Sequence, residues 1–128
     1  MIHHIELYVS DLERSKHFWG WFLEELGYEV YQRWEGGISW KANGAYIVFV
    51  QAQGEFLKAG YHRRRVGLNH LAFQAASREQ VDEITEQLTR RGYQLLYEDR
   101  HPFAGGSGHY ALYTEDPDRI KVELVAPC

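Results

Sequence analysis

Cysteine is nearly absent from this chain of 128 residues, since the only cysteine, Cys128, is the last residue. No disulfide framework is available, so the fold has to rest on a buried apolar core, which a single domain of this length can form. The chain also lacks an apolar run long enough to span a membrane. It begins "MIHHIELYV", without the basic and apolar regions of a signal peptide. We therefore expect a cytoplasmic protein with no membrane partner.

An excess of basic charge is lacking as well. Fourteen Lys and Arg residues stand against eighteen Asp and Glu residues, which gives a formal net charge of −4. Proteins dedicated to nucleic acid usually carry a basic surface, so this composition predicts no nucleic-acid partner. The one basic run, "HRRR" at 62–65, is short, and we interpret it as part of a solvated linker.

What the chain does contain is an internal repeat. The first half reads as a strand "IHHIELYV", a helix over about 11–26, and strands "YEVYQRW", "ISWK" and "AYIVFVQ". The second half reads as a strand "GLNHLAFQ", a helix over about 77–91, and strands "QLLYED", "HYALYT" and "IKVELV". Each half is therefore predicted to be a βαβββ module. The modules are residues 1–51 and 67–128, and residues 52–66 form a linker.

Both predicted helices have start and stop signals. Asp11 is a suitable N-cap for the first helix, and Ser77 with Gln80 forms a capping box for the second. Gly27 and Gly92 follow the last helical residues, where a left-handed conformation commonly ends a helix.

Three polar side chains share the strand face that points away from the predicted helices. His4, His70 and Glu123 each lie near the middle of an otherwise apolar strand. A single histidine in a strand is usually a structural residue with one hydrogen bond. Two imidazoles and a carboxylate at matching positions of a repeat instead predict a concave metal site. The alternative is a scaffold of the same shape that does not bind metal.

The segments "HIELYVSDLERSKHFW", "NHLAF" and "YTEDPDRIKVEL" resemble the vicinal oxygen chelate superfamily. Its members include glyoxalase I, extradiol dioxygenases, fosfomycin-resistance enzymes and bleomycin-binding proteins. The resemblance implies an α+β fold in which two βαβββ modules form a curved mixed sheet. It also implies a divalent metal ion held by His4, His70 and Glu123, with Fe(II) or Mn(II) favoured and Zn, Ni or Co as alternatives. Relatives of this length are commonly homodimers.

The same resemblance suggests further site residues. Tyr113 is the expected catalytic residue, because a phenol there reaches a substrate oxygen in related enzymes; a Tyr packed in the sheet is the alternative. Superposing the two modules by sequence places Phe49 opposite Glu123, so a fourth ligand is missing. The loop 101–109 either closes over the site as a lid or remains in solvent. The expected substrate-binding residues are Tyr8, Phe49, Gln51, His101, His109, Arg119 and Lys121.

Three classes of function follow from these observations. The favoured class is a metal-dependent enzyme acting on a small substrate chelated through vicinal oxygens, with extradiol-dioxygenase-type or fosfomycin-type transferase chemistry. A glyoxalase-like lyase or isomerase is the second class, and the missing fourth ligand counts against it. The third class is a metal-free drug-binding module similar to bleomycin-resistance proteins.

Overall fold

The structure, a computed structural model, describes residues 1–128 and divides the chain into two units, Met1–Gly60 and Tyr61–Cys128. The boundary falls inside the predicted linker at 52–66. The sequence predicts no regular structure in this segment, and that prediction is wrong for Gly54–Leu57, which forms a short 3-10 helix, η1. Each unit is described below by itself.

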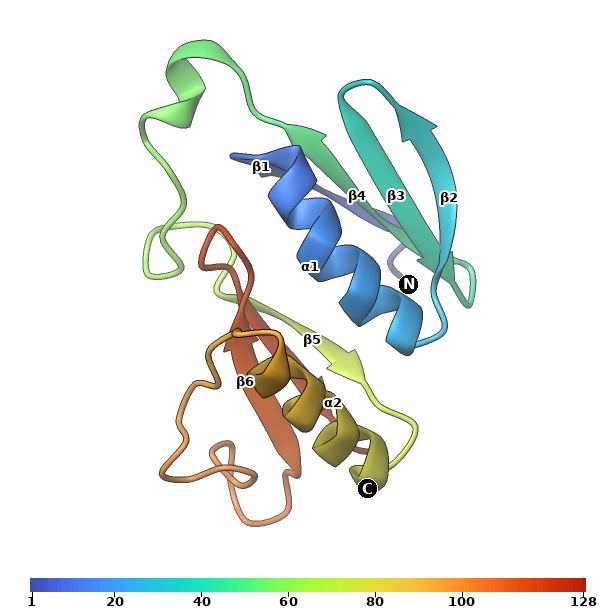
Figure 1. Cartoon of the computed structure of the whole chain (residues 1–128), viewed down its shortest axis with the longest axis vertical. Coiled ribbons are helices and arrows are strands. Elements are labelled where there is room, and N and C mark those ends of the chain that lie inside the picture. The colour runs from blue at the N-terminus through green and yellow to red at the C-terminus, as the bar shows by residue number, and fades with distance from the viewer. The chain divides into compact units, whose positions relative to one another are not determined.

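The first unit is a four-stranded mixed sheet with one helix. Its elements are β1 (His4–Val9), α1 (Leu12–Glu25), β2 (Glu29–Trp34), β3 (Gly37–Ala42) and β4 (Ala45–Gln51). The strand order is β1-β4-β3-β2, with β1 parallel to β4 and the other neighbours antiparallel (Figure 1). This is the predicted βαβββ order.

The second unit is a three-stranded mixed sheet with one helix. Its elements are β5 (His70–Gln74), α2 (Arg78–Arg90), β6 (Ala111–Glu115) and β7 (Lys121–Val125). The order is β5-β7-β6, with β5 parallel to β7 and β6 antiparallel to it. The α+β class and the helix in each repeat are thus confirmed, and the strands lie in two sheets.

One predicted strand, "QLLYED", does not form. Only an isolated bridge joins Leu95 to Thr114, supported by a 2.8 Å hydrogen bond from the Leu96 amide to the Tyr113 carbonyl. At Tyr97 the backbone turns to a positive φ of 56°, and its carbonyl accepts hydrogen bonds from the amides of Arg100 and His101. The chain therefore leaves the sheet as soon as the pairing begins.

The helix signals read from the sequence are confirmed. The Asp11 carboxylate accepts a hydrogen bond of 3.2 Å from the Arg14 amide, and the Ser77 hydroxyl accepts one of 3.1 Å from the Gln80 amide. Gly27 and Gly92 have positive φ angles of 89° and 83°. Neither helix is long and apolar enough to cross a lipid bilayer.

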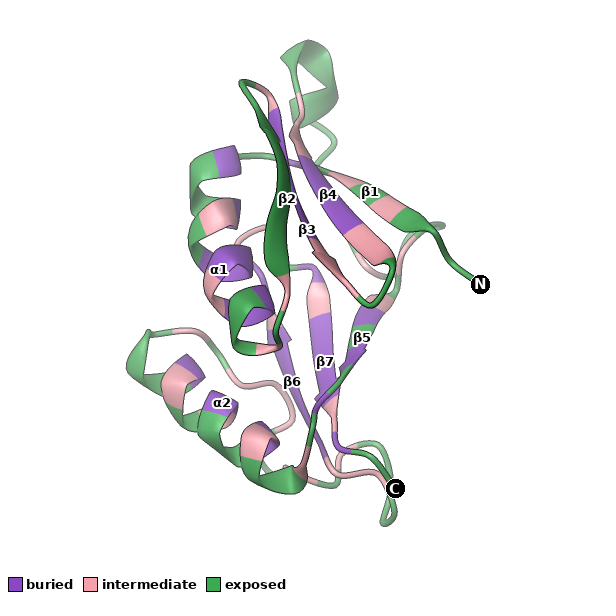
Figure 2. Cartoon of the chain, turned by 90° about the vertical axis from the view of Figure 1, so that its right-hand side faces the viewer, coloured by how far each residue is buried: buried purple, intermediate pink, exposed green.

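Each helix covers one face of its own sheet (Figure 2). In the first unit Trp19 of α1 is fully buried and its ring lies 4.9 Å from the ring of Phe49 on β4. In the second unit the buried face of α2 is formed by Val81, Ile84 and Leu88. The opposite face of each sheet is thereby left to the polar residues of the strands. This separation of faces is what positions the candidate site.

Candidate functional site

The site in the second unit is assembled by strand register. On the face opposite α2, Glu123 of β7 lies between Ala72 of β5 and Tyr113 of β6. Two residues earlier, Lys121 lies beside His70. Because side chains alternate along a strand, these residues share one face. Pairing between strands therefore brings the predicted catalytic tyrosine and two predicted metal ligands together.

Glu123 is the centre of this group. Its side chain is only 7% exposed, and it is contacted at both oxygens. His70 Nε2 lies 3.2 Å from Oε1, and His109 Nε2 lies 2.6 Å from Oε2. The Tyr113 hydroxyl donates a further hydrogen bond to the carboxylate. A buried carboxylate is costly unless such partners compensate for lost water, so the surroundings of Glu123 are built to hold a negative charge.

The orientation of His70 is fixed from its other side. Its Nδ1 lies 2.7 Å from Asn69 Oδ1, while Nε2 faces Glu123. A neutral imidazole carries one N–H, so it cannot donate to both oxygens at once. With the hydrogen on Nδ1 donated to Asn69 Oδ1, the Nε2 lone pair faces the carboxylate and can act as a metal ligand beside it. The donor set of His70 and Glu123 therefore fits a divalent metal ion, and Asn69 fixes the imidazole tautomer that a metal needs.

Tyr113 is held as a neutral phenol. Burial, followed by the charge of Glu123 and the hydrogen bond to it, raises the pKa of Tyr113 to about 12. The hydroxyl thus keeps its hydrogen at neutral pH and acts as a donor on the same face as His70. Its ring packs edge to face against Tyr97, with ring centres 5.4 Å apart.

The loop 101–109 folds onto this group. Gly105 packs so closely that an added Cβ would lie 2.7 Å from the Tyr113 hydroxyl and 2.5 Å from the His109 ring. Any side chain at Gly105 would therefore displace the loop or the side chains of His109 and Tyr113. The inward path of the loop brings His109 to Glu123. Alternation along a strand could not have shown this contact, because His109 precedes β6.

Lys121 approaches aromatic rings. Its Nζ donates a hydrogen bond of 3.0 Å to the Tyr97 hydroxyl and lies 5.1 Å from the centre of the Tyr113 ring. Sequence reasoning did not single out Tyr97, because the residue lies in the segment predicted to be a strand. It also passed over Asn69, although its place directly before His70 was a usable signal.

Of the remaining predicted substrate-binding residues, His101 and Arg119 make no contact with Glu123, and Tyr8 lies in the first unit. His101 is half-buried, and that burial lowers its pKa although Asp82 and Glu98 act in the opposite direction. Arg119 is exposed, with its Nε 3.4 Å from Glu115 Oε2. Tyr8 is 75% exposed on β1.

His4 is described within the first unit. It is exposed at the start of β1, and its ring stacks on Tyr46 with ring centres 4.7 Å apart and planes 3° from parallel. Its Nδ1 lies 2.9 Å from His3 Nδ1. Within neither unit do three His, Cys, Asp or Glu side chains form a group able to hold a metal ion. The convergence of His4 with the residues of the second unit remains a prediction.

Phe49 does not lie at the position predicted for it. It is fully buried against Trp19, on the face of β4 that α1 covers, so it does not line a cavity. The registers also correct the superposition of the modules. His4 pairs with Tyr46 as His70 pairs with Lys121, so the residue equivalent to Glu123 is Val48. Valine cannot bind a metal either, and the first module offers no carboxylate at this position.

Gln51 has a structural role in place of the predicted substrate contact. Its Oε1 accepts a hydrogen bond of 2.8 Å from the Leu12 amide at the start of α1. Its Nε2 donates to the carbonyls of Ser10 and Ala52, at 2.8 and 2.9 Å. Three bonds to the backbone occupy the amide, which ties the end of β4 to the loop between β1 and α1.

Replacing Gln51 by leucine is expected to lower the free energy of unfolding by about 1–3 kcal/mol, because the Leu12 amide loses its acceptor in a half-buried position. Urea denaturation measures the loss. Gln53→Leu is the matched control, since Gln53 is exposed and makes no side-chain bond to η1. Wild-type stability together with weakened substrate binding in Gln51→Leu would restore the original prediction.

Comparison with known proteins gives consistent matches along the chain. A sequence model of the Glyoxalase/Bleomycin resistance protein/Dioxygenase superfamily matches residues 1–124. The uncharacterized protein YqjT of Bacillus subtilis (strain 168) is 69% identical over 126 residues, which cover 98% of each chain.

Two solved structures illustrate the likeness in three dimensions. A provisionally assigned glyoxalase from Bacillus halodurans shares 60% identity at a TM-score of 0.98, covering 99% of this chain and 96% of that chain. The fosfomycin resistance protein FosX from Listeria monocytogenes shares 25% identity at a TM-score of 0.72, covering 100% and 93%. The matches to both structures include both units.

Proposed function

This chain belongs to the Glyoxalase/Bleomycin resistance protein/Dioxygenase superfamily, and from that membership we propose that it is a divalent-metal-dependent enzyme. Its substrate is a small molecule that presents two adjacent oxygen atoms, and its chemistry is of the extradiol-dioxygenase or fosfomycin-transferase type. The observation that carries the proposal is the buried Glu123 carboxylate facing a His70 imidazole whose other nitrogen is already engaged by Asn69.

The proposed ligands are His70 and Glu123 from the second unit and His4 from the first. Two imidazoles and one carboxylate suit Fe(II) or Mn(II), and Zn, Ni and Co are the alternatives. When bound, the ion would supply Lewis acidity to the substrate oxygens.

The neighbouring residues of the second unit have distinct roles in this proposal. Asn69 accepts the hydrogen of His70 Nδ1 and so keeps Nε2 available. His109 donates from Nε2 to Glu123 Oε2, which leaves Oε1 as the oxygen on the side of His70. The single hydrogen of the Tyr113 hydroxyl is donated to Glu123 in this structure, and it would turn to a substrate oxygen on which negative charge develops once an ion occupies the carboxylate.

Substrate contacts are proposed for those of the predicted residues whose side chains are not committed to the core or to the backbone. Lys121, beside His70 in register, supplies a positive charge. His101, Arg119 and Tyr8 keep the substrate-binding role predicted for them, and His109 keeps it through Nδ1, because its Nε2 is engaged by Glu123. Phe49 and Gln51 are excluded from it, because their side chains are committed to the core and to the backbone.

The preference for dioxygenase or transferase chemistry over a glyoxalase-type reaction has a specific basis in the register of β4. Val48 stands where a further carboxylate ligand would be equivalent to Glu123. An aliphatic side chain at this position supports a site with three protein ligands, which leaves more positions of an ion open to substrate.

The proposal is tested by the metal content of protein purified without chelators. We expect about one ion per chain, as a site formed by a single ligand set requires, and loss of that ion in Glu123→Gln. Elemental analysis of both preparations measures it, followed by an activity screen with catechols and epoxides on protein reloaded with Fe(II) or Mn(II). Equal metal contents in the two proteins would contradict the ligand assignment, and tight binding of an aromatic drug without metal would favour the drug-binding alternative.

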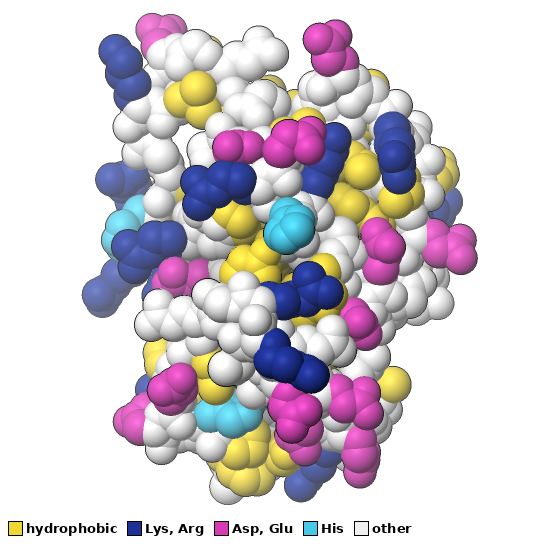
Figure 3. Space-filling view, in the orientation of Figure 1, with side chains coloured by type: hydrophobic (Ala, Val, Ile, Leu, Met, Phe, Trp, Pro, Cys, Tyr) yellow, Lys and Arg dark blue, Asp and Glu magenta, His cyan; other side chains and the backbone are white.

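A cytoplasmic homodimer is also part of the proposal. The chain leaves several large apolar side chains exposed, among them Val30, Tyr31 and Trp34 of β2, which a second copy would cover. In Figure 3 acidic side chains stand among the basic ones over the face shown, without a large uninterrupted basic surface of the kind that nucleic acid binding requires.

A further inference from the structure

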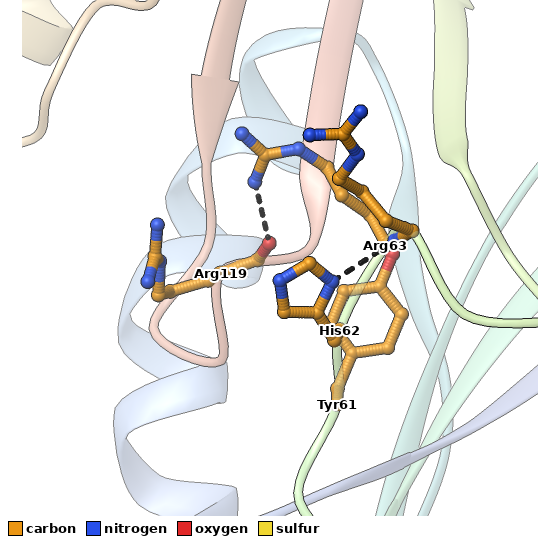
Figure 4. Close-up of a pocket in the computed structure, with 5 residues that line it drawn as sticks. Tyr61, His62, Arg63 and Arg119 are labelled. Carbon is orange, nitrogen blue, oxygen red and sulfur yellow. Dashed lines mark hydrogen bonds between the residues drawn. The ribbon is translucent and has the colours of Figure 1, made fainter.

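The basic run at 62–65 takes part in a pocket of the second unit. Residues 61–69 lead into β5, and residues 116–120 lead into β7. Because β5 and β7 are parallel and pair from His70 and Lys121 onward, both segments reach the same edge of the sheet. There they enclose a cavity of about 220 Å³, which is lined by Tyr61, His62, Arg63, Arg64 and Arg119 (Figure 4).

The walls of this pocket carry an excess of positive charge. Three of the five lining residues are arginines and none is acidic. One carboxylate behind the wall, that of Glu115, receives Arg63 Nη1 at 2.9 Å and Arg119 Nε at 3.4 Å. It therefore contacts two guanidinium groups, that of Arg63 more closely, while neutralising only one charge. The exposed Arg64 guanidinium makes no ion pair.

His62 adds a donor to the same pocket. Its Nδ1 accepts a hydrogen bond of 3.1 Å from the Arg64 amide. In the neutral ring the hydrogen is therefore on Nε2, which remains available as a donor. Figure 4 shows the His62 ring between Arg119 and Tyr61. The pocket thus presents N–H groups from an imidazole and from guanidinium groups.

Tyr61 fixes the wall on the side of β5. Its hydroxyl donates a hydrogen bond of 2.7 Å to the Leu68 carbonyl and lies 3.5 Å from the Asn69 carbonyl. The basic segment is therefore tied to the start of β5 and does not behave as a free linker. The donors of Arg63 and His62 are held in place before a ligand arrives, so less entropy is lost when these two groups bind it.

We propose that this pocket binds an oxyanion of the phosphate class, either free or as the terminal group of a small molecule. Guanidinium groups pair with phosphate oxygens through two parallel hydrogen bonds, and a tetrahedral dianion offers enough oxygens for several donors at once. A carboxylate, with two oxygens and one charge, would leave more of these donors unused. The proposal goes beyond the metal-dependent activity, because it uses neither His70 nor Glu123 and shares only Arg119 with the substrate contacts proposed above.

Isothermal titration calorimetry of the purified full chain with inorganic phosphate tests this proposal. We expect one saturable site per chain, weakened as sodium chloride is raised. Arg64→Gln and, separately, Arg119→Gln are expected to weaken binding at least about tenfold, since each removes a charge-assisted hydrogen bond. Arg90→Gln is the matched control, because Arg90 is exposed on α2 and its only ion pair, to Glu86, is 4.0 Å long. It is expected to bind as the wild type does.

A second titration with phenyl phosphate distinguishes the two sources of the anion. Tighter binding of the ester would identify the terminal phosphate of a larger ligand, and tighter binding of inorganic phosphate would identify the free ion.

The proposal is overturned if phosphate fails to saturate the protein below about 10 mM, or if all three arginine variants bind alike. Unchanged binding in Arg64→Gln and Arg119→Gln would place the anion on the metal instead. Unfolding temperatures of the variants are measured alongside, and elemental analysis separates a failure of this pocket from a failure of the metal site.

Discussion

The His70→Ala variant is expected to lose metal affinity by more than about a hundredfold, since even residues that only orient a metal ligand contribute about 10–100-fold. The substitution removes the Nε2 atom that faces Glu123 and leaves the carboxylate with His109 and Tyr113 as partners. His70 is one-third exposed, so its loss should leave the fold intact. Titration with Mn(II) or Co(II), followed by elemental analysis after dialysis, measures the change.

His17→Ala is the matched control for that experiment, because His17 is exposed on α1. It should bind metal as the wild type does, and both variants should have circular dichroism spectra and unfolding temperatures close to those of the wild type. If His70→Ala retains full metal occupancy, the ligand assignment is wrong.

The second large effect is expected from Tyr113→Phe, which keeps the ring and removes only the hydroxyl. Removing one donor that stabilises a developing negative charge typically lowers turnover by about 100-fold or more. The ring contact with Tyr97 and the buried packing on β6 remain. We therefore expect the loss in kcat, with metal content and unfolding temperature nearly unchanged. Steady-state kinetics with a substrate found by the activity screen measures it.

Tyr31→Phe provides the control for the loss of a phenol, because Tyr31 is exposed on β2 and contacts its neighbours through the ring alone. It should leave kcat unchanged. A Tyr113→Phe enzyme with normal turnover, or one that has mainly lost stability, would make Tyr113 a structural residue of the sheet.

Much of the fold could be predicted from the sequence because each strongly periodic segment has a single face to bury. The helices begin directly after Asp11 and Ser77, as their caps predict, and alternation correctly assigned His70, Glu123 and Tyr113 to the face opposite α2. These predictions depend on local chemistry and on a period of 2 or 3.6 residues, which the sequence displays directly.

The sequence-based predictions are wrong where contacts between residues far apart in the chain determine the structure. Matching the modules letter by letter placed Phe49 opposite Glu123, whereas the hydrogen bonds between β1 and β4 make Val48 the equivalent residue. A shift of one residue turns a side chain to the other face of a strand. The "QLLYED" segment has the composition of a strand, yet the turn at Tyr97 ends its pairing.

The loop contacts of the site could not be predicted either. His109 reaches Glu123 only because a glycine-rich loop folds inward, and no periodicity governs such a path. The run at 62–65 looked like a linker because the sequence shows its charges but not the segment before β7 that lies across from it.

The equal registers of the two parallel strand pairs make one module a template for redesigning the other. A carboxylate introduced at Val48 would stand two residues beyond the neighbour of His4, as Glu123 stands two residues beyond the neighbour of His70. Val48 is only 3% exposed, so a glutamate there would need donors of the kind that His109 and Tyr113 provide for Glu123. A redesign of the first module would therefore have to introduce the carboxylate together with its hydrogen-bond donors. The second module shows the arrangement that such a redesign would copy.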